Sequence, residues 1–405
     1  MPKVLRIINR FNLGGPTYNA AYLTKHLGED YKTILIGGDK ERNEDSSDFI
    51  LNQIGVKPIL IPEMRRSISY KSDIRAYYKI KHIIDRFKPD IVHTHASKAG
   101  SLGRVAAKNA GVPVIVHTFH GHVFHSYFGK TKTTIYKQIE RRLAKVSTRI
   151  IALSEKQKLE LCQEHKICAP EKISVIPLGF DLQRFQENKE EKRKAFRAKY
   201  HVADDEVAIG IVGRLVPVKN HDFFLMAIKK VLDHKPGKVK AFIVGDGERK
   251  EDLLMLAGQL DIPFALGHEN AAEKPLVFTS WEKQVDMVNA GLDIVCLTSL
   301  NEGTPVSLIE AQASGKPVVT TQVGGIENVV LPNKTALLSP KDDVELFSQN
   351  LMQLIVSPEQ RELMGQQGWD WVSDRFHYTR LVRDMRSLYE ELLMKQSPSL
   401  KHKVV

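Results

Sequence analysis

Short apolar segments alternate with amphipathic helical segments along almost the whole chain, and this alternation restricts the possible folds more than any other feature. In the first half, the strand-like segments are VLRIINR (4–10), TILIGG (33–38), VKPILIP (56–62), DIVHTHA (90–96), VPVIVHTF (112–119), RIIALS (149–154) and KISVIPLG (172–179). Continuous apolar strands separated by helices are typical of parallel sheets that are covered on both faces. The sequence therefore predicts a doubly wound α/β fold.

The alternation stops after Leu182 at the charged segment QENKEEKRKAFRAKY (186–200), which reads as having nothing apolar to bury for some distance, so we place the domain boundary near it. It restarts with VAIGIVGRL (207–215), AFIVGDGE (241–248), LVFTSW (276–281), LDIVCLTS (292–299), KPVVTT (316–321) and TALLSP (335–340). A chain of 405 residues fits two domains of roughly 100–200 residues each. We therefore predict a first domain over 1–185 and a second over 200–375, with a C-terminal helix at about 376–396 that packs back on the first.

The net charge of the chain is +11, from 59 Lys and Arg against 48 Asp and Glu, which favours a polyanionic partner. Zinc-finger, homeodomain, RNP and KH patterns do not occur, so we expect no nucleic acid among the partners. No apolar run approaches the roughly 18 residues that span a bilayer, and the N-terminus does not read as a signal peptide. We expect a cytoplasmic protein whose three cysteines are reduced thiols.

Glycines follow the first strand-like segment, where open α/β sheets bind ligands. Gly14 and Gly15 allow close approach of a ligand, and Pro16 suits the first turn of a helix whose amides bind anions. A plain tight turn is the alternative. The third glycine of a dinucleotide-binding loop and the GxxxxGK motif are both missing, and the loop at Gly245 also lacks a third small residue. These absences disfavour a nicotinamide enzyme and a P-loop NTPase.

Histidines gather near the ends of two neighbouring strand-like segments: His93, His95, His117, His120, His122 and His125. A metal site is one interpretation, but no acidic residue or cysteine is interleaved to complete it. In the other interpretation, one or two histidines donate or accept hydrogen bonds at a ligand site, and the rest satisfy local backbone groups. His120 is the best placed for the ligand site.

Cations follow the first strand-like segment of the second half, with Arg214 directly after it and Lys219 five residues later. Two cations beside helix N-terminal amides can bind a diphosphate and neutralise the charge that develops as it leaves. For Lys219 alone, a solvated surface lysine is the alternative.

Two glutamates follow the segment LDIVCLTS. We expect Pro305 to start a helix, with Glu302 in the loop before it and Glu310 more than a turn further on. Side chains lean toward the helix N-terminus, so both carboxylates can reach a ligand there. Two hydroxyl acceptors beside a phosphate-binding helix end suit a sugar nucleotide. If they stood alone, both would read as ordinary solvated glutamates.

The ordered set GGPTYNAA, HTFHGH, GRLVPVKN, VGDGE, NEGTPVSLIE and ASGKPVVTTQVGG resembles family 4 (GT4) of the retaining glycosyltransferases. The resemblance spans both predicted domains. It implies the GT-B fold, in which two doubly wound Rossmann-like domains face a central cleft. DIVHTHASKAGSLGR and VHTFHGHVF look most like bacterial members that build cell-surface polysaccharides.

By this resemblance, Arg214 and Lys219 hold the donor diphosphate, Glu310 binds the ribose, and Glu302 contacts the sugar. The positions implied to contact the donor are Gly14, Gly15, Arg214, Lys219, Gly245, Gly303, Thr304, Pro305, Val306 and Glu310. Those implied at the reacting centre are His120, Glu302, Arg214 and Lys219. Pro16 departs from the pattern, because it removes an amide from the glycine loop. The resemblance also implies catalysis without a metal or other cofactor, and a UDP-sugar as donor, with a GDP-sugar as the other candidate.

The acceptor has a weaker sequence signal. The segment VFHSYFGKTKTTIYKQIERRLAK (123–145) combines aromatic residues with a basic helix, which suits an anionic membrane surface, although a solvated helix has the same composition. We expect a saccharide or polyprenyl-diphosphate-linked acceptor and peripheral attachment to the inner face of the membrane.

Two other functions remain open on the sequence. A UDP-N-acetylhexosamine epimerase of the GT-B fold would need no acceptor, but such epimerases lack this combination of Arg, Lys and the two spaced glutamates. A non-catalytic nucleotide-binding protein would keep the fold without the reaction.

Overall fold

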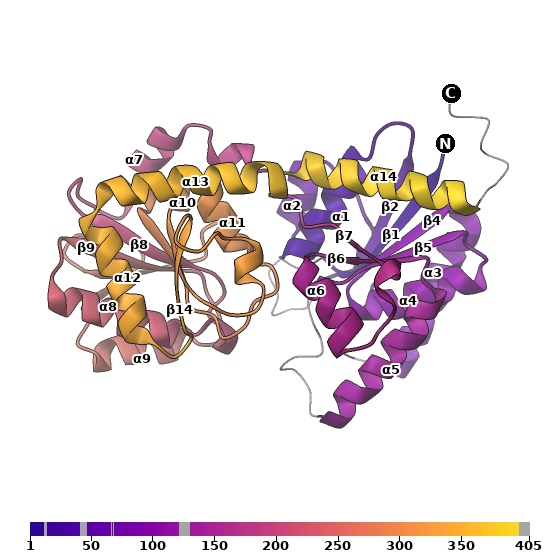
Figure 1. Cartoon of the computed structure of the whole chain (residues 1–405), viewed down its shortest axis with the longest axis horizontal. Coiled ribbons are helices and arrows are strands. Elements are labelled where there is room, and N and C mark those ends of the chain that lie inside the picture. The colour runs from indigo at the N-terminus through magenta and orange to yellow at the C-terminus, as the bar shows by residue number, and fades with distance from the viewer. Residues whose placement is uncertain (12–13, 41–46, 66, 68, 121–129, 397–405) are drawn as a thin grey trace. The chain divides into compact units, whose positions relative to one another are not determined.

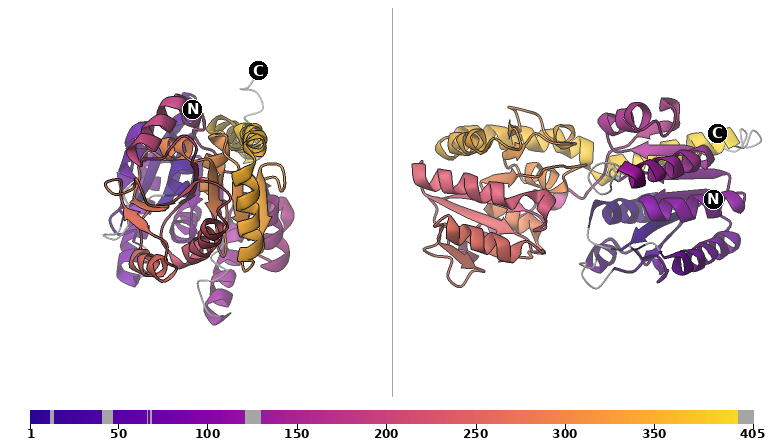
Figure 2. Two further views of the ribbon diagram at one scale, coloured as in Figure 1. Left: turned by 90° about the vertical axis from the view of Figure 1, so that its left-hand side faces the viewer. Right: turned by 90° about the horizontal axis from the view of Figure 1, so that it is seen from below.

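The computed structural model describes residues 1–11, 14–40, 47–65, 67, 69–120 and 130–396 (Figure 1). The chain divides into two compact units. Unit 1 comprises Met1–Phe180 and Phe376–Val405, and unit 2 comprises Asp181–Arg375. Each unit is built on one parallel sheet with helices on both faces (Figures 1 and 2). The predicted α/β class is therefore confirmed in both halves of the chain.

Unit 1 has a seven-stranded sheet in the order β3-β2-β1-β4-β5-β6-β7. The strands are β1 (Lys3–Arg10), β2 (Lys32–Gly38), β3 (Ile59–Leu60), β4 (Ile91–His95), β5 (Val114–Thr118), β6 (Arg149–Ala152) and β7 (Ile173–Val175). The described pairings are all parallel, and Ile7 of β1 lies opposite Thr94 of β4. The strand order reverses between β1 and β4, which is where doubly wound sheets bind ligands.

The helices of unit 1 cover its sheet from two sides. They are α1 (Gly15–His26), α2 (Asp48–Ile54), α3 (Tyr70–Phe87), α4 (Ser97–Asn109), α5 (Lys130–Val146), α6 (Glu155–Leu159) and α14 (Tyr378–Gln396). One apolar cluster joins α1 and α14 to the strands, with Leu23, Leu381 and Met385 fully or almost fully buried. A second cluster joins α3 and α4 to the strands through residues such as Ile80 and Ala99. The C-terminal helix α14 is therefore part of the core of unit 1.

Unit 2 repeats the design with the order β10-β11-β9-β8-β12-β13-β14. Its strands are β8 (Val207–Val212), β9 (Val239–Val244), β10 (Phe264–Leu266), β11 (Leu276–Ser280), β12 (Ile294–Leu297), β13 (Val318–Thr321) and β14 (Ala336–Ser339). Its helices are α7 (Lys189–Lys199), α8 (His221–His234), α9 (Lys250–Gln259), α10 (Val285–Gly291), α11 (Val306–Ala313), α12 (Val344–Val356) and α13 (Pro358–Phe376).

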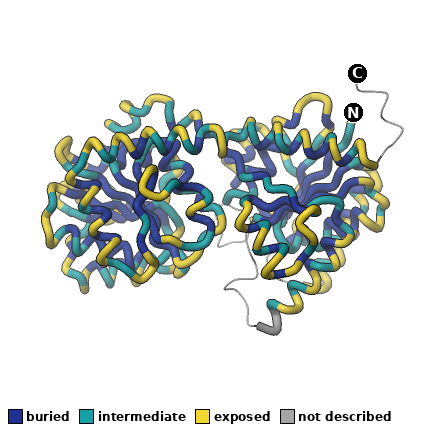
Figure 3. The backbone as a smooth tube through the Cα atoms, viewed as in Figure 1, coloured by how far each residue is buried: buried dark blue, intermediate teal, exposed yellow. Residues whose placement is uncertain are grey.

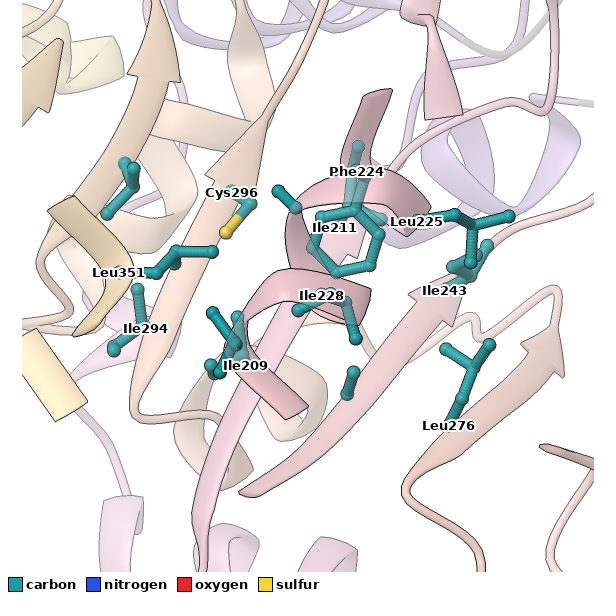
Figure 4. Close-up of a cluster of buried hydrophobic side chains, with 14 of the residues drawn as sticks. Ile209, Ile211, Phe224, Leu225, Ile228, Ile243, Leu276, Ile294, Cys296 and Leu351 are labelled. Carbon is teal, nitrogen blue, oxygen red and sulfur yellow. The ribbon is translucent and has the colours of Figure 1, made fainter. Parts of the chain in front are cut away.

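The central strands of both sheets are deeply buried, whereas the edge strand β3 is exposed (Figure 3). In unit 2, Phe224 and Ile228 of α8 belong to one buried apolar cluster with strand residues such as Ile209 and Ile294 (Figure 4). Cys296 is buried in this core, and the other two cysteines are partly buried and likewise unpaired. Among the described residues, no helix is long and apolar enough to cross a membrane.

The charged segment after Leu182 corrects one expectation. We expected a boundary region between 185 and 200 with little to bury, but α7 is an integral helix of unit 2. Phe196 is fully buried against α10, where a side chain at Gly291 would stand 2.1 Å from its ring. Arg197 and Arg193 of α7 both pair with Asp293, at 3.1 and 2.8 Å. Because α7 has many charged residues, the sequence indicated neither its buried apolar face nor its ion pairs.

We predict that Phe196→Ala lowers the free energy of unfolding of unit 2 by about 3–5 kcal/mol, because it removes a fully buried ring and leaves a cavity. Urea unfolding followed by circular dichroism measures this. Lys194→Ala on the exposed face of the same helix is the control and should change little. Equal, small effects of the two substitutions would show that α7 does not pack as described.

Candidate functional site

The loops after β8 and β12 lie side by side in unit 2, because these two strands are parallel neighbours. The Oγ1 of Thr298 donates to the carbonyl oxygens of Lys219 and Asn220, at 3.1 and 3.0 Å. The amide of Leu300 donates to the carbonyl oxygen of Val218, at 2.8 Å. These bonds join the segment before Glu302 to the turn that carries Lys219.

Lys219 and Glu302 form an ion pair at this junction, with 2.6 Å between Nζ and Oε1. Ser299 donates to the same carboxylate oxygen, also at 2.6 Å. The side chains of Lys219 and Glu302 are only 21% and 12% exposed, so water screens the pair less than a surface pair. The sequence predicted both residues for the site, but neither their pairing nor the role of Ser299.

Arg214 lies on the loop directly after β8 and is exposed. Within the described part of the chain, its guanidinium forms no ion pair. It therefore remains available to an anion at the carboxyl edge of the sheet, close in sequence to Lys219.

Gly245 has a structural reason to be glycine. A side chain there would stand 2.0 Å from the carbonyl oxygen of Gly213, and one at Gly247 would stand 2.4 Å from that of Leu215. The amide of Leu215 also donates to the carbonyl oxygen of Asp246, at 2.9 Å. Both glycines therefore let the loop after β9 pack on the loop that carries Arg214. Contact between Gly245 and a ligand stays a prediction.

A second glycine pair supports the loop that contains Glu302, and sequence reasoning gave it no role. The amide of Gly325 donates to the carbonyl oxygen of Glu302, at 2.8 Å. Side chains at Gly324 and Gly325 would stand 2.0 and 1.8 Å from the carbonyl oxygens of Glu302 and Gly303. Two successive glycines, separated by two residues from the strand-like segment that ends at Thr321, were the signal in the sequence that could have indicated this role.

The helix after Glu302 begins one residue later than expected. Pro305 is the N-cap of α11, and Val306 is the first helical residue. Gly303 and Thr304 therefore lie in the loop before the helix, and the free amides of its first turn begin at Val306. Ser307 in that turn has a buried Oγ with no hydrogen-bond partner among the described residues.

Glu310 lies in the second turn of α11, and burial raises its pKa to about 7. Arg184 lowers this pKa and Asp286 raises it, both less strongly than burial. The guanidinium of Arg184 is 3.8 Å from the Glu310 carboxylate. Arg184 was missed because it lies more than a hundred residues away in sequence and outside every motif.

In unit 1, His120 follows β5, and its Nε2 is 2.9 Å from Nδ1 of His95. Burial lowers the pKa of His120 to about 3, so the ring is neutral at physiological pH. The Nδ1 of His120 and the Nε2 of His95 are buried without a partner among the described residues. The two rings therefore form a neutral pair with unused hydrogen-bonding capacity.

The remaining histidines divide into two groups. His93 is hydrogen bonded to Tyr389 and Thr118, at 2.6 and 2.7 Å, and His117 is hydrogen bonded to Thr94, at 2.8 Å. These partners are side-chain hydroxyls, and His117 also has a backbone hydrogen bond with Thr94, the kind of local partner that we expected. His122 and His125 lie outside the described residues. In the described part of the chain, no three His, Cys, Asp or Glu side chains form a group that could hold a metal ion.

Gly14 and Gly15 stand at the start of α1, on the loop after β1. Gly14 is the N-cap, α1 begins at Gly15, and Pro16 lies in the first turn as predicted. The amide of Thr17 donates to the carbonyl oxygen of Gly14, at 3.1 Å. Since β1, β4 and β5 are neighbours, these glycines and His120 lie at the same carboxyl edge of the unit 1 sheet.

Family profiles match both units of the chain. The family described as Glycosyl transferases group 1 matches residues 192–371, and the family described as Glycosyltransferase Family 4 matches residues 13–184.

Known relatives extend over most of the chain. The chain is 31% identical over 342 residues to the UDP-Gal:alpha-D-GlcNAc-diphosphoundecaprenol alpha-1,3-galactosyltransferase of Escherichia coli, covering 84% of the chain and 85% of the relative. It is 26% identical over 337 residues to the capsular polysaccharide biosynthesis glycosyltransferase CapM of Staphylococcus aureus, covering 82% and 84%. A crystal structure of HepE from Anabaena in complex with UDP matches with a TM-score of 0.77 and 19% identity, covering 96% and 100%. This last likeness concerns the fold alone.

The buried histidines predict a specific pH dependence of stability. Burial holds the pKa values of His93, His95, His117 and His120 below the ordinary value of 6.5. The unfolded chain takes up protons below about pH 6.5 and the folded chain does not, so stability is full above that pH and falls as the pH decreases. Each histidine contributes a slope of up to about 1.4 kcal/mol per pH unit.

Thermal unfolding between pH 8 and pH 5 measures this dependence. We expect the midpoint temperature of the wild type to decrease as the pH is lowered below 6.5. His117→Gln should make this decrease less steep, because it removes one site of proton uptake. His82→Gln at an exposed position is the control. A midpoint that stays constant or rises down to pH 5 would contradict the prediction.

Proposed function

The chain belongs to glycosyltransferase family 4, and from this membership we propose that it transfers a sugar from UDP to a lipid-diphosphate-linked saccharide, with retention of the anomeric configuration. It is a glycosyltransferase with the GT-B architecture of two doubly wound domains. The epimerase interpretation is not favoured, because the relatives reported above are named as transferases.

The observation that carries the proposal is the pairing of Lys219 with Glu302 beside the start of α11. A nucleotide-sugar donor has a group that complements each residue of this pair. Its diphosphate suits Lys219, Arg214 and the helix amides, and its sugar hydroxyls suit the Glu302 carboxylate. In the proposed complex, Lys219 turns from Glu302 toward the diphosphate, and Ser299 continues to hold the carboxylate.

The proposed mechanism is electrostatic. The bond between the anomeric carbon and the diphosphate oxygen breaks, and the acceptor oxygen forms a bond to the same face of that carbon. The acceptor proton passes to an oxygen of the leaving diphosphate. Arg214 and Lys219 stabilise the negative charge that develops on the diphosphate, in the role that a metal ion has in other transferases. His120, neutral at physiological pH, would accept or donate a hydrogen bond to the sugar and would not transfer a proton.

The nucleotide and the acceptor are proposed from the relatives. The name of the Escherichia coli relative specifies a UDP-sugar and a diphosphoundecaprenol-linked saccharide, and the HepE structure contains UDP. A GDP-sugar is the second candidate for the donor.

We predict slow release of UDP from one UDP-sugar without acceptor and faster release with a lipid-diphosphate-linked saccharide. Lys219→Ala and Glu302→Ala should each reduce the rate by about 10²–10³-fold, because each removes a group that contacts the reacting donor. Mass spectrometry with a panel of UDP-, GDP- and ADP-sugars measures the release, and EDTA should leave the rate unchanged. Lys229→Ala, at a partly exposed position of α8, is the matched control.

The product gives the stereochemical result. The proton NMR coupling of the new anomeric position should match that of the donor, and the opposite anomer would overturn the retaining mechanism. Epimerised sugar in the absence of acceptor would support the epimerase instead.

We further propose that unit 1 binds an anionic membrane surface. On α3, the exposed apolar residues Tyr70, Ile74 and Tyr78 recur every four residues, beside the exposed cations Lys71 and Arg75. Side chains four apart share one face of a helix, so α3 presents an apolar row next to a basic row. This arrangement is typical of helices that lie in a lipid interface.

The described part of the predicted basic segment has the same character. On α5, Ile135 and Ile139 are 56% and 38% exposed, and Arg142 is exposed one turn further on. Residues 123–129 of that segment lie outside the described part of the chain. Both α3 and α5 thus support a membrane-facing role for unit 1.

We predict that the protein pellets with vesicles that contain phosphatidylglycerol at low salt, and that the double substitution Ile74→Ser with Tyr78→Ser weakens pelleting at least about fivefold. Met255→Ser, at an exposed apolar position of unit 2, is the control. Failure of the wild type to pellet with any anionic vesicle would refute membrane binding without affecting the transferase proposal.

A further inference from the structure

Arg184 and Glu310 form an ion pair that links the beginning of unit 2 to α11. Arg184 lies in the short helix Gln183–Phe185 and is the fourth residue of unit 2. Its guanidinium carbon also lies over the Phe185 ring, 4.8 Å from the ring centroid, and this contact restricts the conformations of the side chain. The side-chain amide of Gln186 donates to the carbonyl oxygen of Ala313 at the end of α11. The segment is therefore attached to α11 at two points.

The ion pair leaves the Glu310 carboxylate available to a ligand. The distance of 3.8 Å is too long for a direct hydrogen bond. Among the described residues, no donor forms a hydrogen bond with this carboxylate, although the side chain is only 14% exposed. The carboxylate oxygens of Glu310 are not among the fully buried atoms that lack a partner, so this partly buried carboxylate is still accessible to a ligand. Two hydroxyl groups of a ligand would satisfy it.

The charged groups around Glu310 come from three elements. Arg184 faces it from the short helix, and Asp286 faces it from α10. Lys192 of α7 pairs with Asp286 at 2.8 Å and donates to the carbonyl oxygen of Arg184 at 2.6 Å. Lys192 thereby moderates the repulsion from Asp286 and holds the backbone of Arg184. Arg184 is therefore the cation that lowers the pKa of Glu310 directly.

We propose that Arg184 is a positioning residue for nucleotide recognition: it keeps Glu310 ionised and oriented so that the carboxylate accepts hydrogen bonds from the ribose hydroxyls. The inference rests on the proposed function, in which Glu310 binds the ribose. An ionised carboxylate accepts stronger hydrogen bonds than a protonated one. The preference for a ribose over a deoxyribose therefore depends on a residue that does not touch the nucleotide.

The sign of the pH dependence follows from the surroundings of Glu310. Burial places its pKa near 7, and Arg184 keeps that pKa from rising further. The ribose preference should be full at pH 8 and should fall as the pH decreases through about 7. Without the cation at position 184 the same loss should occur at higher pH.

Isothermal titration of the full-length protein with UDP and with 2′-deoxy-UDP at pH 6, 7, 8 and 9 tests the inference. The wild type should bind UDP about tenfold more tightly than 2′-deoxy-UDP at pH 8, and less selectively at pH 6. Arg184→Gln should reduce the ratio to about threefold or less at pH 7 to 8 and recover part of it at pH 9. Arg184→Lys should retain most of the ratio, and Glu310→Gln should give a low ratio at every pH.

Arg193→Gln is the matched control, because it removes a neighbouring cation whose partner Asp293 also pairs with Arg197. It should leave the ratio and its pH dependence unchanged. Since the Arg184 side chain is 23% exposed, we expect the variants to fold, and thermal unfolding checks this.

Three outcomes would overturn the inference. If Glu310→Gln lowers the ratio but Arg184→Gln matches the wild type at every pH, Arg184 has no positioning role and the transferase proposal stands. If Arg184→Gln weakens UDP and 2′-deoxy-UDP equally, Arg184 acts elsewhere on the ligand. If the wild type binds no nucleoside diphosphate, the proposed function fails first, and this inference fails with it.

Discussion

The parallel pairing of β8 with β12 is the constraint on which the candidate site of unit 2 depends. It places the loop that carries Lys219 beside the loop that carries Glu302, although 83 residues separate them in sequence. Hydrogen bonds from Thr298 and Leu300 then hold the two loops together. The ion pair between Lys219 and Glu302 follows from this arrangement, because both side chains occupy one small volume at the carboxyl edge of the sheet.

Backbone packing between loops makes that arrangement precise. Gly245, Gly247, Gly324 and Gly325 lie where two loops approach so closely that a side chain would collide with a backbone carbonyl oxygen. A glycine in a loop after a strand of such a sheet is commonly interpreted as a position that contacts a phosphate group of a ligand. Here Gly245 and Gly325 are required by the protein's own loops, whether or not a ligand also approaches them.

The two units use charge in different ways. Unit 2 holds partly buried ions in pairs, such as Lys219 with Glu302 and Arg184 with Glu310, whose partners a charged ligand could exchange. Unit 1 also buries an ion pair, Arg104 with Glu140, but at the carboxyl edge of its sheet it buries neutral groups. His95 and His120 are kept neutral by burial and hydrogen bonded to each other. Such a division suits a donor site that stabilises a leaving anion and a second region that orients hydroxyl groups without transferring protons.

The sequence by itself determined the α/β class, most strand positions and the residues at the strand ends, because burial of a parallel sheet requires continuous apolar segments between helices. It did not reveal the short edge strand β10 (Phe264–Leu266), which has three residues and depends on pairing with β11. It also concealed the buried face of α7, because charged residues surround Phe196 in the sequence. Only the tertiary structure decided that Lys219 pairs with Glu302, that Arg184 faces Glu310, and that Gly325 supports the loop of Glu302. These contacts join residues far apart in the chain, and their geometry is set by strand order and loop packing, which no local pattern encodes.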